Sequence, residues 1–167
     1  MSATVKTPLG ATTTNRKWYC DVNTGDDTTP DWVGVFGITE FKPTVEGTTQ
    51  DDSDFDGEGW KSETTTANAW KNEGKVKRAQ QEGVTPPVYD PGQELIRAAS
   101  TKTGVDNVLE FRWYEMQPSG PRVEAYQGRA AVAYSEEGGG VDALSMASFT
   151  LTGRGKRSEI THPDAAV

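Results

Sequence analysis

An acidic segment in the first half of the chain has the clearest spacing for chemistry. Residues 52–63 read DSDFDGEGWKSE and fit the calcium-loop pattern D-x-[DN]-x-[DN]-G-x5-E, which would use Asp52, Asp54, Asp56 and Glu63 as ligands. In the helix–loop–helix calcium proteins this loop joins two helices. The flanking segments here are rich in Thr and contain Pro and Gly, so they predict no helices. This context favours a solvated acidic loop, and a non-helical calcium loop is the alternative.

Residues that could carry out catalysis are sparse. His162 is the only histidine, and its polar surroundings near the C-terminus favour a surface histidine over a general base. Cys20 is the only cysteine, which argues against an intramolecular disulfide and against a cysteine-based zinc site. The 25 acidic residues ensure that some carboxylates lie close together, so no single pair marks a hydrolase. We therefore expect no enzyme activity, no cofactor and no resident metal.

Two further groups of residues could bind ligands. A basic stretch could contact phosphate, although the acidic surplus favours a solvated strand face with salt bridges. The basic stretch consists of Lys71, Lys75, Lys77 and Arg78. Several tryptophans could form a platform on which sugars stack, although core or subunit-interface anchors are the commoner use. These tryptophans are Trp32, Trp60, Trp70 and Trp113. A carbohydrate-binding β-sandwich module with exposed tryptophans is therefore the alternative function.

Length and charge restrict the class of protein. The 167 residues suit one domain, and five each of Trp, Tyr and Phe supply apolar anchors for a folded core. The net charge is 17 − 25 = −8, which disfavours a generic nucleic-acid binder because phosphate binding needs a basic surface. No stretch approaches the roughly 20 apolar residues of a membrane span, so we expect no membrane association.

Strand patterns occupy most of the chain. Alternation of apolar and polar residues predicts strands at residues 16–22, 32–41, 70–78, 107–116, 122–135 and 141–152. The strand at 70–78 has no apolar face, which is typical of an edge or lumen-lining strand. One helix is predicted over residues 93–103, with Asp90 as N-cap, Pro91 in its first turn and Gly104 as its stop.

These elements predict a mainly β domain, a two-sheet β-sandwich or partial barrel with one flanking helix. It would span residues 15–155, with an N-terminal arm at 1–14 and a C-terminal arm at 156–167. The polar segment 42–66 is expected to be a long extended loop, and loops of this length in compact domains usually have a function.

Several segments, taken in order, resemble the major tail proteins (tail tube proteins) of long-tailed bacteriophages, particularly the siphophages that infect actinobacteria. No single segment is diagnostic, but the series covers most of the chain. The segments are WVGVFGITEFKP at 32–43, TTQDDSDFD at 48–56, GWKSETTTANAW at 59–70, YDPGQELIRAA at 89–99, FRWYE at 111–115, EAYQGRAAV at 124–132 and LTGRGKR at 151–157.

The resemblance implies a structural virion protein of the phage tail, assembled in the host bacterial cytoplasm. Six copies would form a ring whose strands close one large barrel, and stacked rings would form the tube that conducts DNA during ejection. The implied partners are further copies of the chain and the tail terminator, tail tip and tape measure proteins. Double-stranded DNA would pass without adhering, because an acidic lining repels phosphates over roughly 8 Å at physiological salt.

The resemblance also implies roles for particular residues. Family members bind the next ring through a long loop and terminal arms, so the loop at 42–66 and both arms are expected to make these contacts. The expected inter-ring residues are Asp51, Asp52, Asp54, Phe55, Asp56 and Trp60. The polar face of the 107–116 strand could line the bore or face solvent, and its residues are Glu110, Arg112 and Tyr114.

Overall fold

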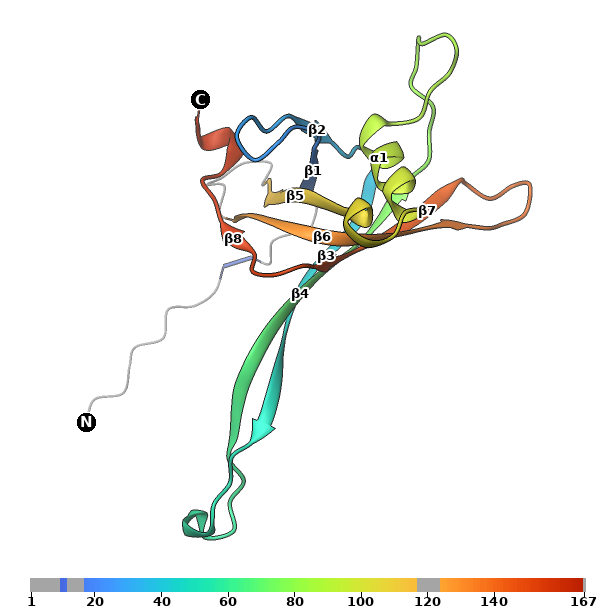
Figure 1. Ribbon diagram of the computed structural model, residues 1–167. Coiled ribbons are helices and arrows are strands. Elements are labelled where there is room, and N and C mark those ends of the chain that lie inside the picture. The colour runs from blue at the N-terminus through green and yellow to red at the C-terminus, as the bar shows by residue number, and fades with distance from the viewer. Residues whose placement is uncertain (1–9, 12–16, 117–123, 167) are drawn as a thin grey trace.

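The computed structural model describes residues 10–11, 17–116 and 124–166, so all of the predicted N-terminal arm except residues 10–11 lies outside the described part. The described residues form eight strands and one α-helix (Figure 1). The strands are β1 (Trp18–Asn23), β2 (Trp32–Gly34), β3 (Ile38–Asp51), β4 (Glu63–Lys77), β5 (Val108–Glu115), β6 (Ala125–Glu137), β7 (Met146–Gly153) and β8 (Ser158–Glu159). The helices are α1 (Pro91–Ser100) and three short 3-10 turns, Phe55–Gly57, Gly104–Asn107 and Pro163–Ala166. None of these helices is long and apolar enough to cross a bilayer.

The strands form one antiparallel sheet in the order β2-β1-β5-β6-β7-β4-β3, with β8 added beside β6. The predicted mainly β class with one helix is confirmed. The hydrogen-bonded ladder is unbroken from β2 to β3, so the partial barrel describes this fold and two separate sheets do not. The sheet curls until Trp18 of β1 stacks on Phe41 of β3, with ring centroids 5.8 Å apart. Strands β1 and β3 form no hydrogen-bonded ladder with each other in the described sheet, and a cavity of about 750 Å³ opens beside the contact of their two rings.

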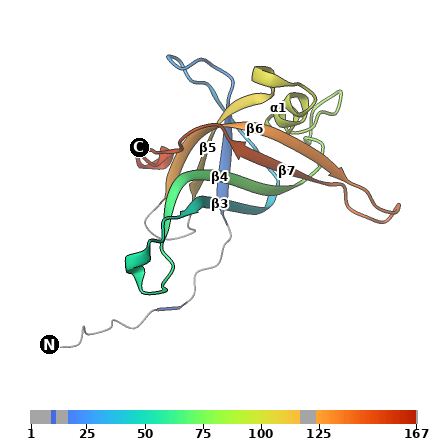
Figure 2. The same cartoon turned by 60° about the horizontal axis from the view of Figure 1, so that its bottom comes forward.

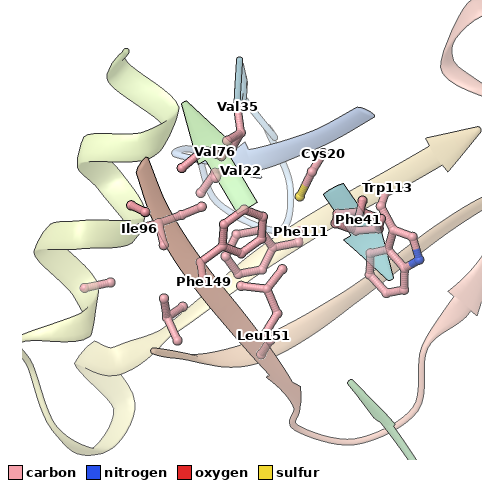
Figure 3. Close-up of a cluster of buried hydrophobic side chains, with 14 of the residues drawn as sticks. Cys20, Val22, Val35, Phe41, Val76, Ile96, Phe111, Trp113, Phe149 and Leu151 are labelled. Carbon is pink, nitrogen blue, oxygen red and sulfur yellow. The ribbon is translucent and has the colours of Figure 1, made fainter. Parts of the chain in front are cut away.

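The core lies inside the curl of the sheet (Figure 3). Cys20 and Val22 of β1 and Phe111 and Trp113 of β5 are buried there, as the alternation in their strands predicts. Phe149 of β7 joins them, and the face of α1 that carries Ile96 and Ala99 packs on the same core.

Strand β4 is interior and not an edge, which was one of the two roles that its sequence predicts. It pairs with β3 on one side and β7 on the other. Its inner face carries Trp70, Asn72, Gly74 and Val76, so a polar residue and a glycine interrupt the apolar pattern of a buried face. A Cβ on Gly74 would lie 2.4 Å from the ring of Phe149, so the aromatic ring fills the place that a side chain of β4 would take.

Asp90 caps helix α1 as predicted, but the helix begins at Pro91, two residues before the predicted range, and ends three residues earlier than predicted. The carboxylate of Asp90 accepts a hydrogen bond from the backbone N–H of Gln93 at 3.0 Å, and Pro91 lies in the first turn. Thr101 is the C-cap, and Gly104, with φ of +64°, begins a separate 3-10 turn. The chain therefore leaves the helix before the glycine expected to stop it.

The segment at 42–66 is a β-hairpin and not the predicted loop. Strands β3 and β4 stay paired from Ile38↔Val76 out to Asp51↔Glu63, and the outer half of this hairpin extends away from the body of the sheet (Figures 1 and 2). Thr is β-branched and suits a strand, so a Thr-rich polar segment can pair without a core to bury.

The C-terminal segment packs against its own domain, which differs from the arm predicted at 156–167. Strand β8 pairs with Tyr126 and Gln127 of β6, and the backbone N–H of Ile160 donates to the carbonyl of Ala125 at 3.0 Å. His162 is buried, so the prediction of a surface histidine was wrong. The polar composition of this segment concealed its backbone pairing.

Candidate functional site

The tip of the β3–β4 hairpin carries two large aromatic side chains that nothing in the described chain covers. We refer to residues 51–63 as the hairpin tip. Phe55 is fully exposed and Trp60 is 83% exposed. The backbone there is ordered locally, because Asp54 caps the 3-10 turn by accepting from the N–H of Asp56 at 3.1 Å. Exposed aromatic residues on an ordered turn are typical anchors for a protein partner.

The hairpin tip is also strongly acidic. Its six acidic residues and one lysine give a net charge of 1 − 6 = −5. None of these carboxylates forms an ion pair with another described residue, and the acidic residues are Asp51, Asp52, Asp54, Asp56, Glu58 and Glu63. Hydrogen bonds from Thr64 and Ser62 lower the pKa of Asp52, and a hydrogen bond from Ser53 lowers that of Asp51. Both groups therefore stay ionised at neutral pH.

The calcium pattern does not form a cage. Among the described residues, no group of three or more His, Cys, Asp or Glu is placed to hold a metal ion. The carboxylate of Asp52 accepts from the hydroxyl of Thr64, and that of Asp54 accepts from a backbone N–H of its own turn. These carboxylates bind groups of the hairpin itself.

The four tryptophans do not form a sugar-stacking platform. Trp70 and Trp113 are buried and lie 4.8 Å apart, centroid to centroid, in the core. Trp32 lies under the guanidinium of Arg112 at 4.7 Å, and Trp60 is exposed at the hairpin tip, on a different part of the fold. The alternative of a carbohydrate-binding module with an exposed tryptophan surface is therefore not supported.

The outward side of four adjacent strands forms a polar surface, which we call the polar sheet face. In the three rows that define it, the side chains are small or charged and no apolar one is larger than Ala; Met146 of β7 lies on the same side in the next row. The rows across it are Thr44, Lys71, Thr152 and Ala131; Lys42, Glu73, Thr150 and Ala133; and Glu40, Lys75, Ser148 and Ser135. Helix α1 packs on the opposite side of the sheet, so it leaves this face open.

The basic stretch of β4 is largely neutralised, as predicted. Lys71 contacts Glu73 at 3.2 Å, and Lys75 contacts Glu137 at 3.7 Å. Arg78 is buried against the ring of Tyr89, 4.0 Å from its centroid, and binds Glu94 at 2.7 Å. Lys77 is the exception, because it is exposed and forms no ion pair within the described residues.

The residues predicted to line the bore lie further along the same side of the sheet, in a partly buried network. Arg112 binds the buried carboxylate of Asp21 at 2.7 Å, and the hydroxyl of Tyr114 donates to the same carboxylate at 3.2 Å. Burial and then the charge of Asp21 raise the pKa of Tyr114. Glu110 accepts from Asn23 at 2.7 Å and from Gln127 at 2.8 Å. This network joins β5 to β1 and β6.

His162 completes the cover of that network. Its ring packs edge-on against Tyr114, with centroids 5.2 Å apart, and its Nε2 lies 2.9 Å from the carbonyl oxygen of Glu115. It thus anchors the C-terminal segment over β5. No nucleophile is hydrogen-bonded to it among the described residues, and its contacts are structural ones.

A cavity at the far end of the β3–β4 ladder from the tip was not predicted from the sequence. We call it the end pocket; its volume is about 360 Å³. Its lining is Phe36, Gly37, Lys77, Ala79, Gln80, Gln81, Asp90 and Gln93. These residues come from three separate segments, so no local pattern marks the site. Phe36 was predicted to lie within the 32–41 strand, but it follows β2 by two residues and is exposed.

Comparison with known proteins gives no match at the level of sequence, either to a family model or to a curated protein. The structure does match. A chain in the virion of a native gene transfer agent particle aligns with a TM-score of 0.63 and 12% identity, over 90% of this chain and 100% of that chain. A chain in the tail of an empty gene transfer agent particle, solved with C6 symmetry, aligns with a TM-score of 0.59 and 11% identity, over 84% and 95%.

The chain shares its fold with components of phage-like virion and tail particles. A third match, from the six-fold symmetrised baseplate of the anti-feeding prophage, has a TM-score of 0.56 and 6% identity and covers 91% of this chain and 97% of that one. At these identities the likeness establishes the fold alone. It agrees with the expected mainly β domain and its single helix, and it spans almost the whole of each matched chain.

Proposed function

We propose that this chain is the structural subunit of a phage-like tail tube, similar to the major tail proteins of siphophages. In this proposal six copies close into a ring, rings stack, and DNA passes through the bore during ejection. The observation that carries the proposal is the fold, shared over nearly the whole chain with a component of a C6-symmetric tail. The tail terminator, tail tip and tape measure proteins would be its further partners.

The open edges of the sheet support ring closure. Strand β3 is 14 residues long, and among the described residues it pairs on one side only, with β4. Such an edge presents unpaired N–H and C=O groups to a neighbouring chain, and a heterologous contact that closes on itself makes a ring. Strands from all copies would then form one wide barrel, because barrel diameter increases with strand number.

The hairpin tip supports stacking. Its exposed aromatic residues lie at the end of a projection that has no partner in its own domain. We propose that the tip contacts the next ring. The contact residues would be Asp51, Asp52, Asp54, Phe55, Asp56 and Trp60.

We propose that the polar sheet face lines the bore. Two of its three lysines are paired with carboxylates, Lys71 with Glu73 and Lys75 with Glu137, which leaves Lys42 as its one lysine without an ion pair among the described residues. Phosphates would therefore find few free cations there. The polar groups of Arg112 and Tyr114, which the sequence also suggested for the bore, are occupied by Asp21. The lining would thus be small, polar and close to neutral.

Thiol labelling tests which face lines the bore. Cys20 is 1% exposed and burial raises the pKa of its thiol, so the chain supplies no reactive background. In assembled tubes, Thr150→Cys should react with a small maleimide but not with a maleimide on a polymer too wide to enter the bore. Tyr19→Cys, on the β1–β5 part of the same side, should react with both. If Tyr19→Cys reacted only with the small maleimide and Thr150→Cys reacted with both, Glu110, Arg112 and Tyr114 would lie at the bore instead.

Electron microscopy tests the function itself. Purified protein at high concentration, with tail tip proteins added as nuclei, should form hollow rings or tubes with sixfold end views. A matched variant replaces residues 49–66 by an Asn-Gly turn, which closes two-residue hairpins. It should remain folded by circular dichroism, and it should give no stacked tubes. A wild-type chain that stays monomeric under all these conditions would contradict the proposal.

A further inference from the structure

The hairpin tip and the end pocket form the two halves of one contact. We infer that the tip of one copy docks head to tail into the end pocket of a second copy in the adjacent ring. This inference rests on the proposed tail-tube function and adds the acceptor surface on the partner copy.

Position is the first argument. The tip follows the last pair of the β3–β4 ladder, Asp51↔Glu63, and the end pocket adjoins the first pair, Ile38↔Val76. The two surfaces therefore lie at opposite ends of one hairpin (Figure 1). A displacement of a second copy along the hairpin by about the ladder length brings tip and pocket together. The ladder covers 51 − 38 = 13 residue steps, or roughly 43 Å at about 3.3 Å per residue.

Apolar complementarity is the second argument. Phe36, at the mouth of the end pocket, is 68% exposed although it is a large aromatic residue. Ala79 and Lys77, which has a long aliphatic chain, also line the pocket. The tip supplies Phe55 and Trp60, which are exposed in turn. A cavity of about 360 Å³ has room for an aromatic side chain, and such pockets bind aromatic anchors well.

Charge is the third argument. Lys77 lines the end pocket and has no ion-pair partner among the described residues, unlike Lys71 and Lys75 of the same strand and Arg78, which follows it. The tip carries a net charge of −5 with all of its carboxylates unpaired. Bringing the two together gives Lys77 a carboxylate partner and orients the contact, while the other acid of the pocket, Asp90, already accepts hydrogen bonds from the backbone of Phe36 and Gln93.

The end pocket is also held in shape before any partner arrives. The side-chain amide of Gln93 donates to the carbonyls of Phe36 at 2.6 Å and of Lys77 at 3.1 Å. The carboxylate of Asp90 accepts from the N–H of Phe36 at 3.3 Å. Helix α1 thus fixes the backbone of both pocket walls, which reduces the entropy lost on docking.

A second basic surface competes as acceptor on charge alone. The turn with Arg154, Lys156 and Arg157 is more cationic than the end pocket. However, the indole of Trp70 donates to the carbonyl of Gly155 at 2.9 Å, so this turn lies beside the base of the projecting hairpin. A tip arriving along the hairpin direction meets the opposite end of the domain first. Position therefore favours the end pocket.

Cross-linking between engineered cysteines tests the contact in assembled tubes. Lys61→Cys places a thiol beside Trp60, and Ala79→Cys places one in the end pocket. With a short bis-maleimide, an equimolar assembly of the two single variants should give covalent dimers and nothing larger. The double variant should give a ladder of dimers, trimers and higher multimers, because each copy both donates and accepts. Each single variant alone should stay monomeric on a denaturing gel.

The control acceptor is Lys156→Cys, combined in the same way with Lys61→Cys. Cross-links to Lys156→Cys in place of Ala79→Cys would overturn the inference and leave the proposed function intact, and so would intact tubes without any cross-link. Should microscopy find no rings or tubes for the wild-type chain, both proposals fail together. A further variant, Phe36→Ser, should lower the cross-linking yield about tenfold between Lys61→Cys and Ala79→Cys, as expected for the loss of an apolar anchor of about 1.4 kcal/mol.

Discussion

At Gly74 the inner face of β4 touches the ring of Phe149 directly. An added Cβ would lie 2.4 Å from the ring, which is closer than real side chains approach. We expect Gly74→Val to lower the free energy of unfolding by about 1–3 kcal/mol, the usual cost of overpacking a core. Urea denaturation of the monomer measures this. The matched control Gly138→Val, at a position with nothing within 4 Å of its Cβ, should change stability little.

Glu94 links helix α1 to Arg78, the residue that follows β4, and makes the stability of the domain depend on pH. Burial, the largest influence, raises its pKa, but Arg78 and Arg97 outweigh it and leave the pKa below the ordinary 4.5. The stabilisation of the fold by the ion pairs of Glu94 is therefore fully present above about pH 4.5, and it is lost as pH falls through the lowered pKa. Wild type should exceed Glu94→Gln in unfolding free energy at neutral pH, and the difference should shrink in acid. A constant difference from pH 7 to pH 3 would contradict this.

At the scale of elements, the N-terminus of α1 joins two parts of the fold. The carboxylate of Asp90 accepts from the backbone of Gln93 and from that of Phe36. We expect Asp90→Ala to destabilise the domain by about 1–2 kcal/mol, as loss of an N-cap does. Asp90→Asn retains an accepting oxygen and should lose much less. Thermal unfolding followed by circular dichroism compares them, and equal midpoints for the two variants would argue against the cap.

Elements with a buried face could be predicted from the sequence. Alternation in β1 and β5 placed Cys20, Val22, Phe111 and Trp113 on the core side correctly, because one face of each strand is apolar. The N-terminal end of α1 could also be recognised, because the N-cap Asp90 and Pro91 in the first turn are signals local to the sequence. The end of α1 was missed by three residues, since a helix can end on tertiary contacts that leave no local signal in the sequence.

Elements without such a face could not be predicted. The outer β3–β4 hairpin is polar on both sides, so no alternation of apolar and polar residues marks its strands. Its Thr content was the only strand signal. The acidic and aromatic residues of the tip were identified because they adjoin in sequence. The end pocket was missed because it joins Phe36, Lys77 and Gln93, which only the folded sheet and helix bring together.

For the whole molecule, the contact between tip and pocket makes the hairpin a ruler for ring spacing. Two residues inserted into β3 near Glu46 and two into β4 near Ala69 preserve the alternation of faces. We expect the axial repeat of the tubes to increase by up to about 7 Å, two residue steps. The control inserts one residue in each strand, which turns the outer side chains to the wrong face and should prevent stacking. Power spectra of stained tubes measure the repeat, and an unchanged spacing would argue against the ruler.

The separation of contacts along the chain also sets the order in which the tip and the end pocket form during folding. The β3–β4 hairpin is local, and hairpins form in microseconds, whereas the end pocket needs Gln93 of α1 to contact Phe36, 57 residues earlier in the chain, and such a contact forms more slowly. If the tip docks into the end pocket, a folding chain therefore has a formed tip before it has a formed end pocket. A variant with an intact hairpin but an undocked α1 would bind to the end of a growing tube through its tip and offer no end pocket to the next ring. Such a variant should stop the growth of tubes and shorten them in mixtures even when it is the minor component.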